Sequence, residues 1–414
     1  MHCKFFHGKF FRSKIVQGLF CISLLFPYSA LFADEVFRIG IIGTDTSHVP
    51  AFAKTFNNPN AAEPFNGFKV VAAYPGGMPD NPSSWDRVKQ YADGLVKDGA
   101  KIYGTIEEML PNVDGILLES VDGRPHLEQA KPVIAAGKPL FVDKPMAGSL
   151  ADVIALFKFA QEQKVPVFSA SSLRYSPDFQ KVLQEKTFGN ILGCDAWSPC
   201  TLNDKHPDLF WYGVHGVETL FTLMGPGCVS VSRTQTPGTE TVVGVWKDKR
   251  IGTFRGTRAG KHDYGAVVFG DKGIGLAGKY GGYEPLALQI AQFFKTGKAP
   301  VSAEETIEIF AFMEAADRSK ISGRIVALAD VIDEASKEVS IPAVLNIAAD
   351  GKLTLNAEEI TSDSLAAVLD GLVSGKTNHR VKVIVKSKKG VPFETVQKVC
   401  SNLGKAMLAN YIYE

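Results

Sequence analysis

Short apolar runs that alternate with helix-like segments organise the chain from Val36 to Phe168. Strands that alternate with helices at such short spacings predict a parallel, doubly wound sheet, and therefore an α/β fold. The predicted strands are Val36–Gly43, Phe68–Tyr74, Lys101–Tyr103, Asp114–Glu119, Pro139–Asp143 and Val165–Phe168. In an open sheet of this kind, ligands bind at the carboxyl ends of the strands. Since one apolar strand runs directly into Asp143, Lys144 and Pro145, we predict that Lys144 lies near the centre of the site.

The pattern changes after Phe168. Several segments are typical of antiparallel strands between glycine and proline turns, with helices predicted at 213–223, 284–296 and 303–322. We predict a first domain over residues 34–168 and a mixed α+β substrate or oligomerisation domain over residues 169–332, with all three helices packed on the second. Residues 339–414 combine an Asp350-Gly351 hairpin turn with helices and a further strand, which predicts a small α+β C-terminal domain. The polar segment 333–338 would be the linker.

Residues 1–33 have the features of an export signal. A basic region precedes an apolar run that begins at Ile15, and the acidic Asp34 follows Ala33. The run is short and contains Pro27, which favours a cleaved signal and a periplasmic protein. An uncleaved anchor stays open as the alternative, because Leu31 stands where a small residue is preferred. No twin arginine is present, so the export route would carry unfolded chains.

Charge and cysteine content exclude some classes of protein. The formal net charge is +1, and residues 1–33 carry four basic and no acidic residues, so the chain from Asp34 would carry −3. Neither value predicts a nucleic-acid partner. The cysteines that follow the signal are Cys194, Cys200, Cys228 and Cys400, and their spacing predicts no metal site. A Cys194–Cys200 disulfide is an alternative to isolated buried thiols.

The turn after the first strand reads Gly40-Ile-Ile-Gly43-Thr44-Asp45-Thr46-Ser47-His48. A strand that ends in glycine and turns into a helix offers backbone N–H groups to a phosphate. The predicted cofactor contacts in this turn are Gly40, Gly43, Thr44, Ser47 and His48. The dinucleotide fingerprint, however, has glycine at the positions of Asp45 and His48, and the acid expected after the second strand is missing. A tight turn that binds no nucleotide is therefore the alternative.

The order of several motifs resembles the Gfo/Idh/MocA oxidoreductases. These motifs are 114–118, 125–130, 136–147 with Asp143-Lys144-Pro145 in place of Glu-Lys-Pro, Arg174–Pro177, Gly213–Glu218 and 316–324. The resemblance covers about residues 36–330. It implies a Rossmann domain followed by a mixed-sheet domain, an NAD or NADP cofactor, a sugar or polyol substrate and a homo-oligomer.

By position, the resemblance implies that Lys144 and His215 are catalytic. Lys144 would bind or polarise the reacting hydroxyl or carbonyl group, and His215 would be the acid or base. Further contacts implied are Asp143, Lys144 and His126 to the cofactor and Arg174, Tyr175, Trp211 and Glu218 to the substrate. The alternatives are a structural ion pair for Lys144, an interface histidine for His215 and a helix-start cap for His126.

Some positions depart from the family pattern. Trp211 stands where the family usually has an Asp four residues before the histidine, and Glu218 replaces the usual Asp three residues after it. Together with Asp45 and Tyr74, and with export as an unfolded chain, Trp211 favours an alternative function. In that alternative, a degenerate Rossmann protein binds a carbohydrate or an envelope partner without redox chemistry.

The C-terminal segment resembles the periplasmic domain of ExbD/TolR-type biopolymer transport proteins. The matching stretches are 346–357, 381–386 and 391–398. In that family the domain mediates protein contacts and dimerisation. The resemblance therefore implies contact with an envelope protein, and an independent cap without a partner is the alternative.

Overall fold

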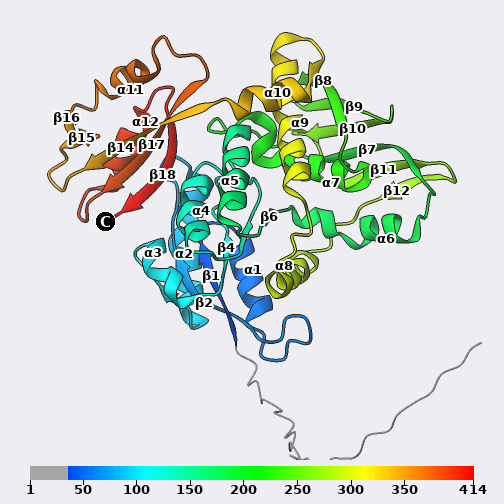
Figure 1. Cartoon of the computed structure of the whole chain (residues 1–414), viewed down its shortest axis with the longest axis horizontal. Helices are drawn as coiled ribbons and strands as arrows, with labels where there is room; N and C mark the ends of the chain where they lie inside the picture. The colour runs from blue at the N-terminus through cyan, green and yellow to red at the C-terminus, as the bar shows by residue number, and fades with distance from the viewer. Residues whose placement is uncertain (1–35) are drawn as a thin grey trace, which may run out of the picture. The chain divides into compact units, whose positions relative to one another are not determined.

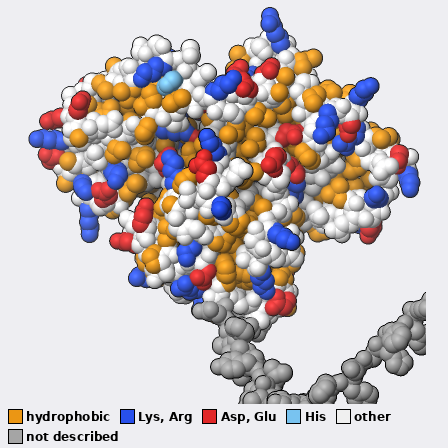
Figure 2. Space-filling view, viewed as in Figure 1, with side chains coloured by type: hydrophobic (Ala, Val, Ile, Leu, Met, Phe, Trp, Pro, Cys, Tyr) orange, Lys and Arg blue, Asp and Glu red, His pale blue; other side chains and the backbone are white. Residues whose placement is uncertain are grey.

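Three β-sheets organise residues 36–414, which are the residues that the computed structural model describes (Figure 1). The predicted export signal lies outside the described residues. No helix within residues 36–414 has the length and apolar character needed to cross a membrane. On the face shown in Figure 2, basic and acidic side chains are interspersed over all parts of the surface.

The first sheet has six parallel strands in the order β3-β2-β1-β4-β5-β6. Its strands are β1 (Phe37–Ile42), β2 (Phe68–Tyr74), β3 (Lys101–Ile102), β4 (Gly115–Leu118), β5 (Leu140–Val142) and β6 (Val167–Ser169). The principal connecting helices are α1 (His48–Phe56), α2 (Pro82–Lys97), α3 (Ile106–Met109), α4 (His126–Ala135) and α5 (Leu150–Gln163). β4 and β5 are buried along their whole length, as expected for a sheet covered on both faces. The predicted doubly wound α/β fold is confirmed, and its strand order reverses between β1 and β4, where ligands bind in such sheets.

The second sheet has seven strands in the order β12-β11-β7-β10-β9-β8-β13. Its strands are β7 (Ile191–Pro199), β8 (Cys228–Thr236), β9 (Thr239–Trp246), β10 (Ile251–Thr257), β11 (Gly265–Gly270), β12 (Ile274–Ala277) and β13 (Val326–Ala327). Helices α7 (Val214–Met224) and α9 (Ala303–Ser322) pack on this sheet. α7 approaches closely because Gly216 faces Phe254, and a Cβ at Gly216 would lie 2.2 Å from that ring. The predicted mixed sheet is confirmed.

Helix α8 (Glu284–Thr296) packs on the first sheet instead, so its predicted place on the second domain is wrong. Its apolar side, which includes Leu286, Ile290 and Phe293, belongs to the core cluster of Phe52 and Phe168. The rings of Phe293 and Phe168 lie 4.8 Å apart. Burial of this apolar side against the first sheet is favourable, and it decides where α8 packs even though α8 follows the second sheet's strands in the sequence.

The third sheet forms the C-terminal part, with strand order β16-β15-β14-β17-β18. Its elements are β14 (Val339–Ile347), β15 (Leu353–Leu355), β16 (Glu358–Ile360), α11 (Leu365–Val373), β17 (His379–Ser387), α12 (Phe393–Ser401) and β18 (Met407–Tyr413). The predicted hairpin is present, with Gly351 at φ +83°. Much of the predicted linker is helical, because α10 (Leu328–Ser336) extends through it.

The C-terminal sheet domain contacts the first domain at the start of α2. Trp85 stacks on Phe393 with 4.4 Å between ring centres and an angle of 6°. Met78 lies in the core cluster of the third sheet. This domain therefore covers the segment that follows β2.

The cysteines Cys194, Cys200, Cys228 and Cys400 are free and buried, which excludes the Cys194–Cys200 disulfide.

Candidate functional site

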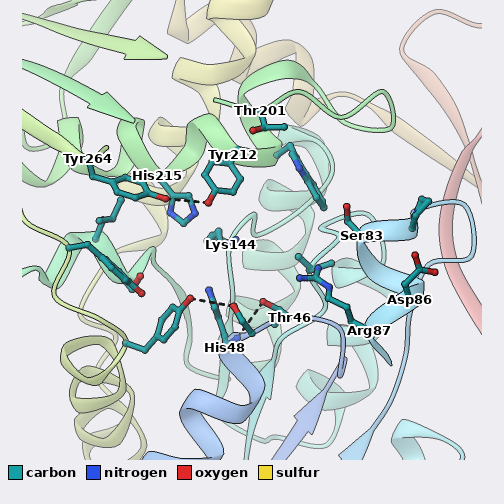
Figure 3. A pocket seen from close by; sticks show the side chains of 18 residues that line it. Thr46, His48, Ser83, Asp86, Arg87, Lys144, Thr201, Tyr212, His215 and Tyr264 are labelled. Carbon is teal, nitrogen blue, oxygen red and sulfur yellow. Dashed lines mark hydrogen bonds between the residues drawn. The ribbon is translucent and has the colours of Figure 1, made fainter. Parts of the chain in front are cut away.

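A cavity of about 670 Å³ lies at the carboxyl ends of the strands of the first sheet, where side chains of the second domain close it (Figure 3). Thr46, Ser47 and His48 line it from the turn after β1, and Lys144 from the end of β5. Other lining residues include Val121, Ser172, Trp211, Tyr212, His215, Tyr264, Tyr280 and Tyr283. The cavity is therefore placed where the strand order predicts a ligand.

His48 and Asp143 meet beside this cavity. His48 Nδ1 lies 2.6 Å from Asp143 Oδ2, and both side chains are buried. Burial acts to raise the pKa of Asp143, but the neighbouring His48 and Lys144 outweigh it and hold that pKa below its ordinary value. Because Nδ1 faces the carboxylate, Nε2 is the nitrogen of His48 that can meet a ligand.

His215 enters the cavity from α7. Its Nδ1 lies 2.8 Å from Ser171 Oγ. Burial lowers the pKa of His215 well below its ordinary value, and the nearby Lys144 and His48 lower it further. His215 is therefore neutral at neutral pH and can accept a proton from a ligand.

Glu119 is a site residue that the sequence analysis missed. It directly follows β4, is fully buried, and has no hydrogen-bond partner for either carboxylate oxygen among the described residues. Its Oε2 lies 3.9 Å from His48 Nδ1. Burial raises the pKa of Glu119 well above its ordinary value, and the charge of Asp143 raises it further. The available signal was its position, because it ends a strand next to the one that carries Asp143.

The backbone of the turn after β1 is engaged within the protein. The N–H groups of Gly43 and Thr44 donate to the carbonyls of Tyr74 and Pro75, each at 2.8 Å. The Thr44 hydroxyl donates to the Val88 carbonyl in α2 at 2.9 Å. Gly43 has φ +86°, and a Cβ there would lie 2.4 Å from the Ser120 backbone nitrogen. Close packing of strands, rather than a phosphate, accounts for glycine at this position.

Gly40 also has a structural reason. A Cβ on this residue would lie 2.8 Å from Ile116 Cδ1 in the neighbouring strand β4. Thr44 and Gly40 do not line the cavity, whereas Ser47 and His48 do. Of the cofactor contacts predicted in this turn, Ser47 and His48 can therefore meet a ligand in the cavity, and Gly40 and Thr44 cannot.

Asp45 occupies the position of the second fingerprint glycine, where a pyrophosphate would approach the backbone. Its carboxylate accepts the Val121 N–H at 2.9 Å and the Ser84 hydroxyl at 2.5 Å. It is fully buried, and burial raises the pKa of Asp45 to about 6. A buried carboxylate, joined to α2 through Ser84, therefore stands at the position where the fingerprint has its second glycine.

His126, a predicted cofactor contact, lies away from the cavity. His126 is fully buried, with Nε2 2.7 Å from the Ser120 carbonyl and Nδ1 3.1 Å from the Met146 carbonyl. It does not line the cavity, and its ring contacts two loop carbonyls instead of capping the start of α4.

Of the four predicted substrate contacts, Trp211 lines the cavity. Arg174 and Glu218 form a buried ion pair, and Arg174 also lies 2.7 Å from Glu305. Arg174, Glu218 and Tyr175 do not line the cavity. Their direct role toward a substrate stays a prediction.

The strand order and the cavity define a Rossmann-type protein with an added mixed-sheet domain. Residues 37–171 match the Gfo/Idh/MocA model, described as an oxidoreductase family with an NAD-binding Rossmann fold. An uncharacterized oxidoreductase from Synechocystis sp. is 33% identical over 89 residues, which are 21% of this chain and 24% of that protein. The match thus spans about a quarter of the curated relative. These matches support the predicted family and confirm the predicted class of cofactor at the level of the family.

Solved structures show the same fold. A scyllo-inositol dehydrogenase from Lactobacillus casei, with bound NAD(H) and scyllo-inositol, is 14% identical with a TM-score of 0.56, and covers 71% of this chain and 100% of its own. A protein described as a probable dehydrogenase from Thermotoga maritima is 20% identical with a TM-score of 0.59, covering 72% and 100%. An oxidoreductase from Agrobacterium radiobacter, in complex with NAD+, L-tartaric acid and magnesium, is 13% identical with a TM-score of 0.56, covering 71% and 99%. Over a quarter of this chain has no counterpart in them, and the ExbD/TolR resemblance stays a prediction.

Proposed function

We propose that this protein binds a sugar- or polyol-like molecule in the central cavity, where Lys144 polarises one of its hydroxyl or carbonyl oxygens and a histidine can exchange a proton with that oxygen. The main support for this proposal is that Lys144, His48 and His215 line one cavity, from the end of β5, the start of α1 and α7. A cation and two imidazoles around one small space are the groups needed to polarise an oxygen and to move its proton.

The three groups have distinct roles in this proposal. The Lys144 ammonium donates a hydrogen bond to the ligand oxygen and stabilises negative charge that develops there. His215, neutral at neutral pH, accepts the proton, with Nδ1 held by Ser171. His48, with Nδ1 against Asp143, offers Nε2 as a second acid or base.

The aromatic lining supports a polyhydroxylated ligand. Tyr212 and Tyr264 place their hydroxyl oxygens 3.2 Å apart, and Tyr280 and Tyr283 line the same space. Tyrosines combine an apolar ring face with a polar hydroxyl, which suits a molecule with both C–H and O–H surfaces. A solved neighbour holds scyllo-inositol, which is a ligand of this kind.

Oxidation of the ligand by NAD or NADP is the second candidate, and the family match favours it. Asp45 argues against the family's pose for the cofactor, because its buried carboxylate would repel a pyrophosphate. The two candidates share Lys144 and His215 and differ in whether a dinucleotide binds.

Titration followed by tryptophan fluorescence tests the proposal, since Trp211 lines the cavity. We expect inositols or hexoses to change the signal of the wild-type protein, and Lys144→Met to weaken binding by about tenfold or more, since a charge-assisted hydrogen bond contributes about 1.5–3 kcal/mol. Lys158→Met, an exposed lysine on α5, is the matched control and should leave binding unchanged.

Titration with NAD(H) and NADP(H) separates the two candidates. The proton-transfer candidate predicts no saturable binding at millimolar concentration. Saturable binding together with cofactor-dependent turnover of the polyol would establish the oxidoreductase candidate instead.

We also propose export through residues 1–33, a protein contact through residues 339–414 and a homo-oligomer. Export and the protein contact rest on the sequence patterns of residues 1–33 and 339–414. The third is supported by exposed apolar side chains of the second sheet, including Leu192, Ile251, Ile274 and Leu276, which are 56, 54, 67 and 76% exposed.

A further inference from the structure

We propose that His48, Glu119 and Asp143 bind one divalent metal ion at the edge of the cavity. This metal site goes beyond the proposed function, which names no metal ion. Its cation binding can be measured without knowing the organic ligand. The chain spacing predicted no metal site, since the three residues are far apart in the sequence and meet only in the fold.

The sheet brings the three side chains together. His48 begins α1, Glu119 follows β4 and Asp143 follows β5, and β1, β4 and β5 are neighbours in the sheet. One nitrogen or oxygen atom from each residue lies within 4.8 Å of the other two. Bonds of about 2.0–2.2 Å to one ion would place such atoms about 3–3.5 Å apart, so small side-chain shifts suffice.

The Glu119 carboxylate is the unpartnered group of this cluster. Both of its oxygens are buried and have no hydrogen-bond partner among residues 36–414. The 2.6 Å contact between His48 and Asp143 is close but is not aligned as a hydrogen bond. Buried charged groups are normally paired or bound to a metal, so the unpartnered Glu119 carboxylate beside the His48–Asp143 ion pair indicates a missing cation.

Charge and donor type narrow the choice of ion. Two carboxylates supply two negative charges to a 2+ ion, and the Lys144 ammonium beside them leaves the occupied cluster with one net positive charge. Imidazole suits zinc and iron, whereas carboxylates suit manganese and magnesium, so the mixed set favours Zn²⁺ or Mn²⁺. Because His48 lines the cavity and the protein supplies three ligands, an open coordination position can face a bound ligand.

Calorimetric titration of the whole mature chain with Zn²⁺ and with Mn²⁺, after dialysis against EDTA, tests the site. We expect one equivalent to bind the wild-type protein. Glu119→Gln should weaken binding by about tenfold or more, since loss of even an outer-shell partner costs about 10–100-fold. Glu107→Gln, an exposed residue at the start of α3, should bind like the wild type.

A second measurement guards against a variant that fails to fold. Metal analysis and the electron paramagnetic resonance spectrum of Mn²⁺ can be recorded on the wild-type chain alone, and bound Mn²⁺ should show an altered spectrum. The proposal is overturned if the wild type binds neither ion at millimolar concentration, or if a folded Glu119→Gln variant binds as tightly as the wild type. Failure to bind polyol while the metal still binds would reject the proposed function alone.

Discussion

Asp45→Asn is the substitution that tests most directly how the turn after β1 is built. Asp45 is fully buried and its two oxygens meet the Val121 N–H and the Ser84 hydroxyl. Asparagine has the same shape and keeps an acceptor for the Val121 N–H, while its amide N–H₂ faces the Ser84 oxygen in place of the acceptor to which Ser84 donates. The variant therefore removes the charge with little change of shape and reverses the direction of the Ser84 hydrogen bond.

The magnitude follows from the shift of the pKa of Asp45 from 3.8 to about 6 in the folded protein. The folded state holds this proton more tightly, so protonation stabilises it fully below about pH 4, and this stabilisation is lost as the pH rises through about 6. A shift of about two pKa units corresponds to roughly 3 kcal/mol at neutral pH. Since asparagine carries no charge at any of these pH values, we expect Asp45→Asn to unfold with about 3 kcal/mol more free energy than the wild type near pH 7.5, and with a similar free energy near pH 4.

Urea unfolding at several pH values between about 4 and 8 measures this difference. Asp98→Asn, at the exposed end of α2, is the matched control and should change the free energy of unfolding by no more than about 0.5 kcal/mol. A difference between Asp45→Asn and the wild type that stays constant with pH would refute the reasoning, because Asp45 would then carry no buried charge. Destabilisation at neutral pH would show that the carboxylate has a favourable partner.

Two further predictions concern the ends of the chain. Trp85→Ala removes the ring that stacks on Phe393, and because Trp85 is partly buried we expect a loss of about 2–3 kcal/mol in the free energy of unfolding. Hydrogen exchange should become faster within residues 339–414, whereas Trp211→Ala, in the cavity, should leave that domain protected. Mass spectrometry of the exported protein should show a chain that begins at Asp34. An intact N-terminus in the membrane fraction would instead support the uncleaved anchor.

The sequence predicted the first sheet well, because its strands are short apolar runs whose period differs from that of the helices. It also placed Lys144, His48, His215 and Trp211 among the site residues, and all four line one cavity. Strand ends and helix starts can be located from local patterns, and the topology of a doubly wound sheet brings them together.

Features that depend on distant contacts were not predictable in this way. Glu119 resembles any acid at the end of a strand until Asp143 and His48 are placed beside it. The apolar side of α8 is buried against aromatic side chains on the first sheet, and no local pattern in residues 284–296 indicates which sheet the helix packs on. The stacking of Trp85 on Phe393 joins segments far apart in the chain, so neither residue alone indicated how the C-terminal domain docks.

The two departures from the glycine fingerprint indicate a remodelled site rather than a decayed one. Loss of dinucleotide binding alone would allow Asp45 and His48 to be replaced by small or apolar residues, which fill a buried turn at no electrostatic cost. Instead, Asp45 joins the turn to α2 and to Val121, and His48 meets Asp143 and Glu119 beside the cavity. Buried ionisable groups destabilise a fold unless a partner compensates them, and they concentrate at functional sites for that reason. Two hydrogen bonds offset part of the cost of burying Asp45. Glu119 has no such bond among the described residues, as expected for a carboxylate that binds the proposed cation.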